Sequence, residues 1–260
     1  MDMLEIEGVR IAYEFAGTGA TTLSFVHGWC SHLGHWDAQV AALRPTHQVL
    51  RWDRRGMGNS QTEHPAESPD RHGHDLAALL DHVGVERTVV VGHAGGGPTA
   101  VAFAAQHPTR TEGLVLLDTR LYEPASGGEH DEFRTGIERG MARVSAPDGS
   151  AYLARLYPSF FGPLAHPDTV AAAVANALRT PLPVAAAELS HMVSPTVAMA
   201  ATVRCPVLWV SAQPEDTAAI RAIFPDAQVG HVVGSGHFVQ VEVPEQFNAM
   251  LETFVAGLRR

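Results

Sequence analysis

The sequence has only two cysteines in 260 residues, Cys30 and Cys205. Two isolated cysteines supply neither a disulfide framework nor the paired spacing of a structural zinc site. This scarcity argues against a disulfide-stabilised secreted domain, and a reducing cytoplasm is the compartment that we expect.

Long apolar runs and an excess of basic residues are also missing. No window approaches the ~18 apolar residues that a membrane span needs. Residues 1–5 lack the basic region and apolar run of a signal peptide. Lys and Arg total 18 against 28 for Asp and Glu, so the formal net charge is −10. Because phosphate backbones are bound by clustered basic residues, we expect no nucleic-acid partner, no membrane association and no export.

The 15 histidines are scattered, and the closest group is His64, His72 and His74. This group lies in a polar stretch that is typical of a solvated loop and a helix start. We therefore expect no metal site there, and no cofactor elsewhere.

Short apolar, β-branched runs alternate with amphipathic helical stretches, a pattern that predicts an α/β fold with a mostly parallel sheet. The expected strands are residues 9–15, 22–27, 48–52, 88–92, 114–118, 207–211 and 228–233. The expected helices between them are residues 31–43, 70–83, 95–106, 217–223 and 244–257.

The alternation is broken once, from about residue 121 to residue 203. Ala-rich helical stretches at 168–179 and 184–193 occur there without a convincing strand. We therefore predict a core of residues 1–120 and 204–260, with a helical cap of residues 121–203 over one end of the sheet.

The sharpest local signal is residues 88–97, TVVVGHAGGG, an apolar strand that runs into a small-residue helix start. Gly92 and Gly96 frame Ala94 with the spacing of the G-x-S-x-G nucleophile elbow, whose glycines permit a sharp strand-to-helix turn. Ala94 stands at the nucleophile position of this elbow, where we expect a strained backbone. A methyl group carries no lone pair to attack a carbonyl, so this chain should form no acyl-enzyme.

Two interpretations of Ala94 stay open. In the first, alanine replaces a serine in an otherwise intact frame, which disables a hydrolase and traps its substrate. In the second, alanine is natural, in a protein that needs no covalent intermediate or that only binds a ligand.

A second signal is the apolar strand that ends in residues 25–30, FVHGWC. The backbone N–H of Trp29, together with that of Gly95 just after Ala94, would suit an oxyanion. Taken alone, His27 is equally a structural histidine in an ordinary turn.

Together these motifs resemble the α/β-hydrolase-fold proteins that carry a helical cap, over nearly the whole chain. The resemblance implies an eight-stranded, mostly parallel sheet and the chain order nucleophile, acid, histidine. Residues 51–60, RWDRRGMGNS, resemble a structural turn of that family. The turn Gly234-Ser235-Gly236-His237 resembles the one that presents the catalytic base, which implies that role for His237. His231 lies within the preceding expected strand.

The acid has two candidate positions. Asp118 ends a fully apolar strand, and a buried carboxylate needs a partner, which the imidazole of His237 would supply. Many family members place the acid later, in a Gly-x-x-Asp turn, but the segment before Glu215 and Asp216 lacks the glycine. We favour Asp118, with Glu215 or Asp216 as the alternative.

Two subgroups that place the acid after the sixth strand share further features with this chain. Zearalenone-type lactonases resemble it in size and in the small-residue helix after the elbow. Cofactor-free dioxygenases that cleave 3-hydroxy-4-oxoquinolines resemble it in residues 27–30, HGWC, and 211–214, SAQP. In those dioxygenases a His/Asp pair deprotonates the substrate, so they need no serine nucleophile.

We expect the substrate pocket between the sheet and the cap, with a small hydrophobic or aromatic substrate. Its expected lining is Trp29, Trp36, His93, Tyr157 and Phe161. The cap aromatics Tyr152 and Phe160 belong to the same group, and residues 157–163 read as a turn with exposed rings.

The sequence therefore predicts an ester or lactone hydrolase in a form without its nucleophile. Ala94 holds the nucleophile position, His237 is the base, Asp118 the acid, and Trp29 and Gly95 supply the oxyanion N–H groups. The alternatives are a cofactor-independent dioxygenase that uses His237 and Asp118, or a ligand-binding pseudoenzyme. We expect a monomer or a homodimer. Dehalogenase and epoxide hydrolase chemistry is disfavoured, because it needs an aspartate at position 94.

Overall fold

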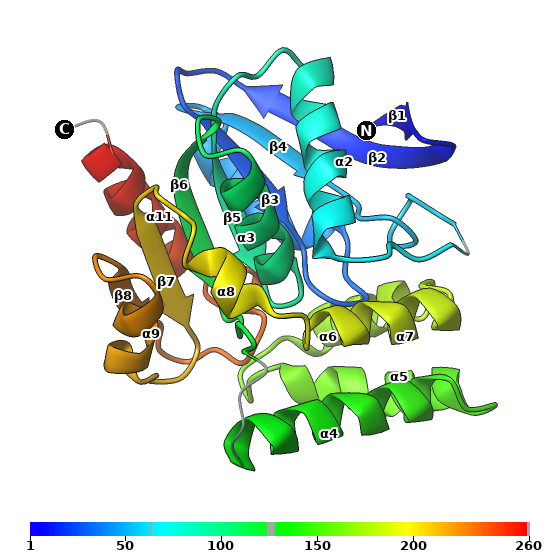
Figure 1. Ribbon diagram of the computed structural model, residues 1–260. Helices are drawn as coiled ribbons and strands as arrows, with labels where there is room; N and C mark the ends of the chain where they lie inside the picture. Colours follow the sequence, from blue (N-terminus) through cyan, green and yellow to red (C-terminus); the bar gives the residue numbers. More distant parts are fainter. Residues whose placement is uncertain (63, 124–127, 259–260) are drawn as a thin grey trace.

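The computed structural model describes residues 1–62, 64–123 and 128–258. Residues 63 and 259–260 of the predicted core and residues 124–127 of the predicted cap lie outside the described residues. Its centre is an eight-stranded sheet in the order β1-β2-β4-β3-β5-β6-β7-β8 (Figure 1). The strands are β1 (Asp2–Ile6), β2 (Val9–Gly17), β3 (Thr22–Val26), β4 (Gln48–Trp52), β5 (Thr88–His93), β6 (Thr111–Leu117), β7 (Val207–Ser211) and β8 (Gln228–His231). Strand β2 is antiparallel to β1 and β4, and all other neighbours are parallel. The predicted mostly parallel sheet is confirmed.

Strand β1 is not among the strands that the sequence pattern predicts. It forms a hairpin with β2 through Glu7 and Gly8, whose φ angles of 47° and 76° are both positive. A two-residue hairpin turn of this kind is most readily recognised by Asn-Gly or Asp-Gly. Glu-Gly gives a weaker signal, which explains the omission.

Helices cover both faces of the sheet. Helices α2 (Pro69–His82) and α3 (Gly96–Gln106) pack on one face, with α9 (Thr217–Ile223) toward the β7 and β8 edge. Helices α1 (Asp37–Leu43) and α11 (Pro244–Leu258) pack on the other. Strand β5 is apolar on both of its faces because each face packs against helices. Val90 belongs to the first apolar core, and its neighbours Val89 and Val91 belong to the second.

The chain between β6 and β7 forms the inserted helices, α4 (Gly128–Val144), α5 (Gly149–Leu156), α6 (Pro167–Ala177), α7 (Leu182–His191) and α8 (Thr196–Ala200). Helices α4 to α7 lie together across one end of the sheet (Figure 1). A short 3-10 turn, η2 (Tyr157–Phe160), follows α5. A third apolar cluster joins these helices to Cys30 and Phe238 of the core.

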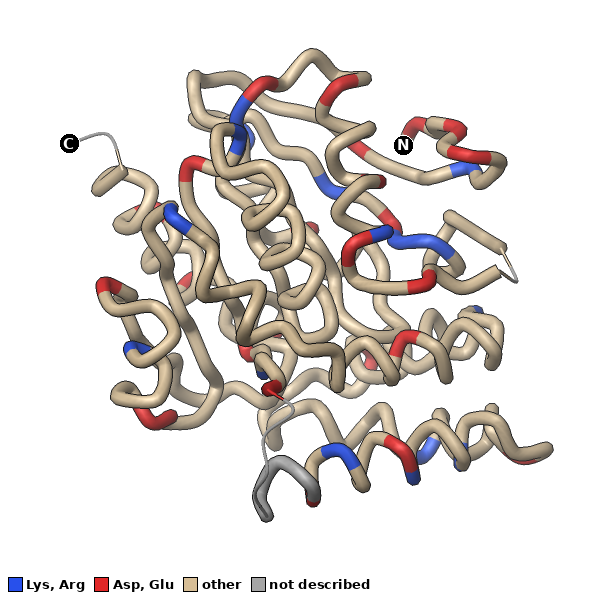
Figure 2. The backbone as a smooth tube through the Cα atoms, viewed as in Figure 1, with Lys and Arg blue, Asp and Glu red and all other residues tan. Residues whose placement is uncertain are grey.

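Charged residues are unevenly distributed along the chain. Strand β5 and helix α3 carry none, and basic and acidic positions are intermixed along the rest of the chain (Figure 2). In the described residues no single helix is long and apolar enough to cross a membrane; only α6 and α7 together, bent by 100°, meet that criterion.

Candidate active site

Ala94 occupies a strained turn between β5 and α3. Its φ of 49° lies in the left-handed region, where a residue with a Cβ is unfavourable. The turn is closed by the Gly97 N–H, which donates to the Ala94 carbonyl at 2.9 Å. The hydroxyl of Thr119 donates to the same carbonyl at 2.6 Å. Residue 94 is thus held in the backbone conformation of an elbow, although its side chain is a methyl group.

The glycines around Ala94 are required by close backbone contacts. A Cβ on Gly92 would lie 2.5 Å from the Gly96 carbonyl oxygen. A Cβ on Gly96 would lie 2.5 Å from the Val26 carbonyl oxygen. Both distances are shorter than real Cβ atoms adopt, so only glycine lets α3 start directly against β3 and β5.

His237 and Asp118 meet beside this turn. The Nδ1 of His237 lies 2.5 Å from Oδ2 of Asp118, and the Ala212 N–H donates to the other carboxylate oxygen at 2.7 Å. Burial alone would raise the pKa of Asp118, but the hydrogen bond and charge of His237 lower it below its usual value. The ionised carboxylate therefore fixes the imidazole with its other nitrogen available for proton transfer.

The other two acid candidates lie away from the imidazole. Asp216 is the N-cap of α9, where its carboxylate accepts from the Ala218 N–H at 2.9 Å. Glu215 is exposed, lies near Trp209 and lines a separate surface hollow. The geometry therefore singles out Asp118 as the partner of His237.

The backbone groups of His237 itself help to hold its turn in place. Its backbone N–H donates to the Phe160 carbonyl at 2.7 Å, so the 3-10 turn η2 supports the loop. Its carbonyl lies 2.9 Å from Nε2 of the buried His93. Burial and the neighbouring His237 lower the pKa of His93 to about 3, so His93 is neutral and donates this bond at neutral pH.

The two expected oxyanion groups are adjacent. A Cβ built on Gly95 would lie 3.5 Å from the backbone nitrogen of Trp29. In the described part of the chain, no backbone carbonyl accepts from the N–H of Trp29 or Gly95. Two donors side by side without an internal acceptor can bind an external oxygen.

A cavity of about 550 Å³ opens at this point, between the sheet and the inserted helices. It is lined by Trp29, His93, Ala94, Gly95, Asp118 and His237 from the core and, among others, Tyr152, Tyr157, Phe160, Phe161, Leu189 and Met192 from the inserted segment. Phe238 and Gln213, which we did not predict, also line it. Among the described residues the lining includes no arginine, and the chain contains no lysine.

Trp36 is a correction to the predicted lining. It is fully buried, and it packs against Phe25 and Phe247 in the core on the α11 face instead of reaching the cavity. The predicted helix over residues 31–43 begins as a 3-10 turn, η1 (Leu33–Trp36), which turns this ring inward. The expectation of exposed rings in residues 157–163 is also wrong for Tyr157, which is fully buried.

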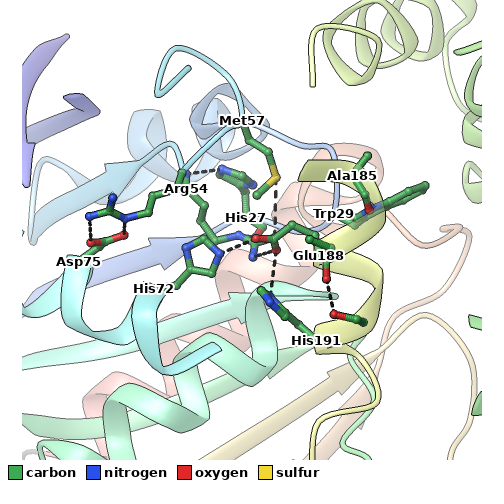
Figure 3. Close-up of polar contacts among 12 residues, drawn as sticks. His27, Trp29, Arg54, Met57, His72, Asp75, Ala185, Glu188 and His191 are labelled. Atoms are coloured by element: carbon green, nitrogen blue, oxygen red, sulfur yellow. Dashed lines mark hydrogen bonds and ion pairs between the residues drawn. The ribbon is translucent and has the colours of Figure 1, made fainter. Parts of the chain in front are cut away.

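A cluster of metal-ligating side chains lies outside the cavity. His72, Glu188 and His191 are buried, with ligand atoms within 4.8 Å of one another (Figure 3). His72 is therefore not solvated as predicted, whereas His64 and His74 are exposed. The Arg54 guanidinium donates to Glu188 at 2.5 Å. Because this cation already neutralises the carboxylate, the cluster is a poor site for a metal ion.

Comparison with known proteins places this geometry among hydrolases. A family model described as the alpha/beta hydrolase fold matches residues 21–244. A protein named carbamate hydrolase RutD, from Caulobacter sp. strain K31, is 28% identical over 247 residues, with 85% of each chain covered. The chain spans less than half the length of the next curated relatives that it matches.

Solved structures agree over the full chain. A thermophilic esterase from Thermogutta terrifontis has a TM-score of 0.84 at 26% identity, covering 99% of this chain and 97% of the esterase. An enol-lactonase from Burkholderia xenovorans LB400 has a TM-score of 0.83 at 21% identity, covering 98% of this chain and all of the lactonase. The second likeness, at its lower identity, shows the fold alone.

Proposed function

The chain belongs to the α/β-hydrolase family, and we propose that its cavity binds an uncharged ester or lactone of a hydrophobic, aromatic molecule. The apolar and aromatic lining favours such a ligand. A carboxylate or phosphate on the ligand would meet no arginine among the described lining residues, and its burial would be unfavourable. The relatives named as esterase and carbamate hydrolase support acyl chemistry.

The observation that carries the proposal is a complete hydrolytic frame around a residue that cannot react. Ala94 has the φ of an elbow, and His237 is hydrogen-bonded to Asp118 beside it. With alanine at this position, the cavity binds its ligand without acyl transfer.

A hydroxyl at position 94, as in Ala94→Ser, would complete the mechanism. His237 would accept the hydroxyl proton as the oxygen attacks the ester carbonyl, and Asp118 would stabilise the imidazolium. The N–H groups of Trp29 and Gly95 would hold the oxyanion. His237 would then protonate the leaving alcohol, and water would release the acid by the reverse steps.

A second candidate function is cofactor-independent oxygenation. The pair His237 and Asp118 is complete without a nucleophilic side chain at position 94. In this reaction His237 removes a proton from an ionisable heteroaromatic substrate, and the resulting anion reacts with molecular oxygen.

The test treats the unmodified chain and Ala94→Ser with a fluorophosphonate probe and weighs both by intact-mass spectrometry. We expect an adduct on Ala94→Ser alone, and none on the double variant that also carries His237→Ala. No adduct on either chain would exclude acyl transfer. Oxygen uptake by the unmodified chain with a 3-hydroxy-4-oxoquinoline would then support oxygenation, and ligand binding without uptake would support a pseudoenzyme.

A further inference from the structure

A buried ion pair connects the inserted helices to the loop that carries the Trp29 N–H. Glu188 belongs to α7, and Arg54 follows β4. Their side chains are only 2% and 1% exposed, with Nη1 of Arg54 2.5 Å from the carboxylate. The second carboxylate oxygen lies 2.6 Å from Nε2 of His72 (Figure 3). Burial alone would raise the pKa of Glu188, but Arg54 and His72 hold it well below its usual range.

Arg54 uses its remaining donors on the two residues that precede Trp29. Its Nε donates to the His27 carbonyl and its Nη2 to the Gly28 carbonyl, both at 3.0 Å. Its backbone N–H donates to Nε2 of His27 at 3.0 Å. Because Nε2 accepts, Nδ1 of His27 carries the proton and donates to the Gly28 carbonyl at 2.9 Å.

The Gly28 carbonyl and the Trp29 N–H belong to one planar peptide unit. In a trans peptide these two groups point in opposite directions, and the described residues contain no cis bond. Arg54 and His27 both donate to the Gly28 oxygen, so they fix the rotation of this plane. The same rotation sets the direction of the Trp29 N–H, whose nitrogen lies 3.5 Å from a Cβ built on Gly95.

Helix α7 also holds the side chain of Trp29. The indole Nε1 donates to the Ala185 carbonyl at 2.7 Å. Ala185 and Glu188 are three residues apart, so they lie on the same side of the helix. One helix therefore restrains Trp29 twice, through its indole and, by way of Glu188 and Arg54, through its peptide plane.

From these contacts we propose that Glu188 is a positioning residue for the oxyanion-binding N–H of Trp29. The role of that N–H in binding an oxyanion rests on the proposed function. The orientation of the Trp29 peptide can be measured independently of that function. Loss of the negative charge would leave the buried Arg54 cation without its partner, free to leave the Gly28 carbonyl. The peptide plane of Trp29 would then lose its fixed rotation.

The experiment compares Glu188→Gln with a matched control, Asp75→Asn. Asp75 forms a second buried ion pair, with Arg55 at 2.6 Å, and in the described residues the other hydrogen bonds of this pair go to Ile6 and Arg71 and not to the Trp29 loop. Both variants lose one buried negative charge, and we expect both to lower the thermal midpoint. If Glu188→Gln does not fold, Glu188→Asp replaces it, because its shorter side chain withdraws the carboxylate from Nη1 of Arg54, and the same two readouts and outcomes apply.

The first readout is the Trp29 amide signal in spectra of the unmodified chain labelled with [15N]tryptophan. The chain has four tryptophans, and Trp29→Phe assigns the signal. We expect Glu188→Gln to shift or broaden it and Asp75→Asn to leave it in place. An unmoved Trp29 amide in Glu188→Gln would overturn the proposal.

The second readout is the fluorophosphonate labelling rate in the Ala94→Ser background. We expect Glu188→Gln to lower the maximal rate by about 10- to 100-fold with unchanged probe affinity, since a misplaced oxyanion donor acts on the transition state. Asp75→Asn should label normally. An unchanged rate in Glu188→Gln would overturn the proposal while the proposed function stands. If Ala94→Ser does not label at all, acyl transfer fails, and the Trp29 amide signal alone decides the proposal.

Discussion

The backbone N–H of Ala212, just after β7, donates to the Asp118 carboxylate at 2.7 Å. Asp118 itself has a φ of 42°, a left-handed conformation at the end of β6. Two neighbouring parallel strands therefore fix the carboxylate that faces His237. A side chain restrained in this way keeps the imidazole in one tautomer and one orientation.

Asp118→Asn should disable proton transfer by His237. The amide cannot supply the negative charge that stabilises the imidazolium, and it favours the wrong tautomer. In the Ala94→Ser background we expect the fluorophosphonate labelling rate to fall by about 10³-fold or more. The rate is followed by intact-mass spectrometry at several times after mixing.

The matched controls are Asp216→Asn and Glu215→Gln, which remove the other two acid candidates. Asp216 caps α9, and asparagine is about as good an N-cap residue, so this substitution should leave both the stability and the labelling rate nearly unchanged. A rate that falls as far in either control as in Asp118→Asn would refute the assignment of the acid.

Ala94→Gly should stabilise the chain. At a φ of 49° the methyl group costs about 1–2 kcal/mol, and glycine avoids this cost. The greater freedom of glycine in the unfolded chain offsets about 0.4–1 kcal/mol. We therefore expect a net gain of up to about 1.6 kcal/mol in the free energy of unfolding, measured by urea denaturation.

The contrasting variant is Ala100→Gly, inside helix α3, which should destabilise by about 1 kcal/mol or more. A destabilised Ala94→Gly would show that the turn tolerates the alanine without strain.

Much of the fold was predictable because its strands are apolar on both faces. Strands β4 and β7 have the bounds expected from the sequence, and the others differ by one or a few residues. Strand β1 is different, since Asp2–Ile6 is largely exposed except at Ile6 and gives no buried run. The edge strand β1 therefore had the weakest sequence signal for a strand.

The candidate site was predictable where a motif fixes the backbone locally. The glycines around Ala94 specify the elbow, and Asp118 follows directly from the end of an apolar strand. Trp36 could not be assigned, because an aromatic ring before a helix packs inward or outward depending on the first turn.

Glu188 is the clearest limit of sequence reasoning. It lies in an Ala-rich helical stretch, where a single carboxylate normally faces solvent. Its burial depends on Arg54, 134 residues earlier in the chain, and on His72. Only the tertiary structure brings these three groups together.

The stability of the chain should fall below pH 6.5 in part through His93. Burial and the neighbouring His237 lower its pKa to about 3 in the folded state, against about 6.5 in the unfolded chain. The unfolded chain therefore binds a proton first as the pH falls. The contribution of His93 to the free energy of unfolding is complete above pH 6.5. It is lost between about pH 6.5 and pH 3, at about 1.4 kcal/mol per pH unit.

The measurement is a series of urea midpoints from pH 7 to pH 4. We expect a shallower loss of stability in His93→Gln than in the unmodified chain. His231→Gln is the control, because His231 is exposed at the end of β8. Parallel pH profiles for His93→Gln and the unmodified chain would contradict the lowered pKa.

Glu242→Gln should loosen the loop that carries His237. The Glu242 carboxylate, in helix α10 (Val239–Glu242), accepts from the Gly162 N–H at 2.8 Å and from the Gly236 N–H at 3.1 Å. It thereby joins the segment after η2 to the residue before His237. A glutamine amide has one oxygen and would turn its NH2 group toward one of these two donors.

In the Ala94→Ser background we expect Glu242→Gln to slow labelling by about tenfold, since small misplacements of a base reduce the rate strongly. Glu245→Gln, on the exposed first turn of α11, is the control and should label normally. The slower labelling should come from the lost acceptor for one of the two N–H groups. The fold should be kept, which circular dichroism checks. Equal labelling rates in the two variants would mean that the Phe160 carbonyl and His93 position His237 without Glu242.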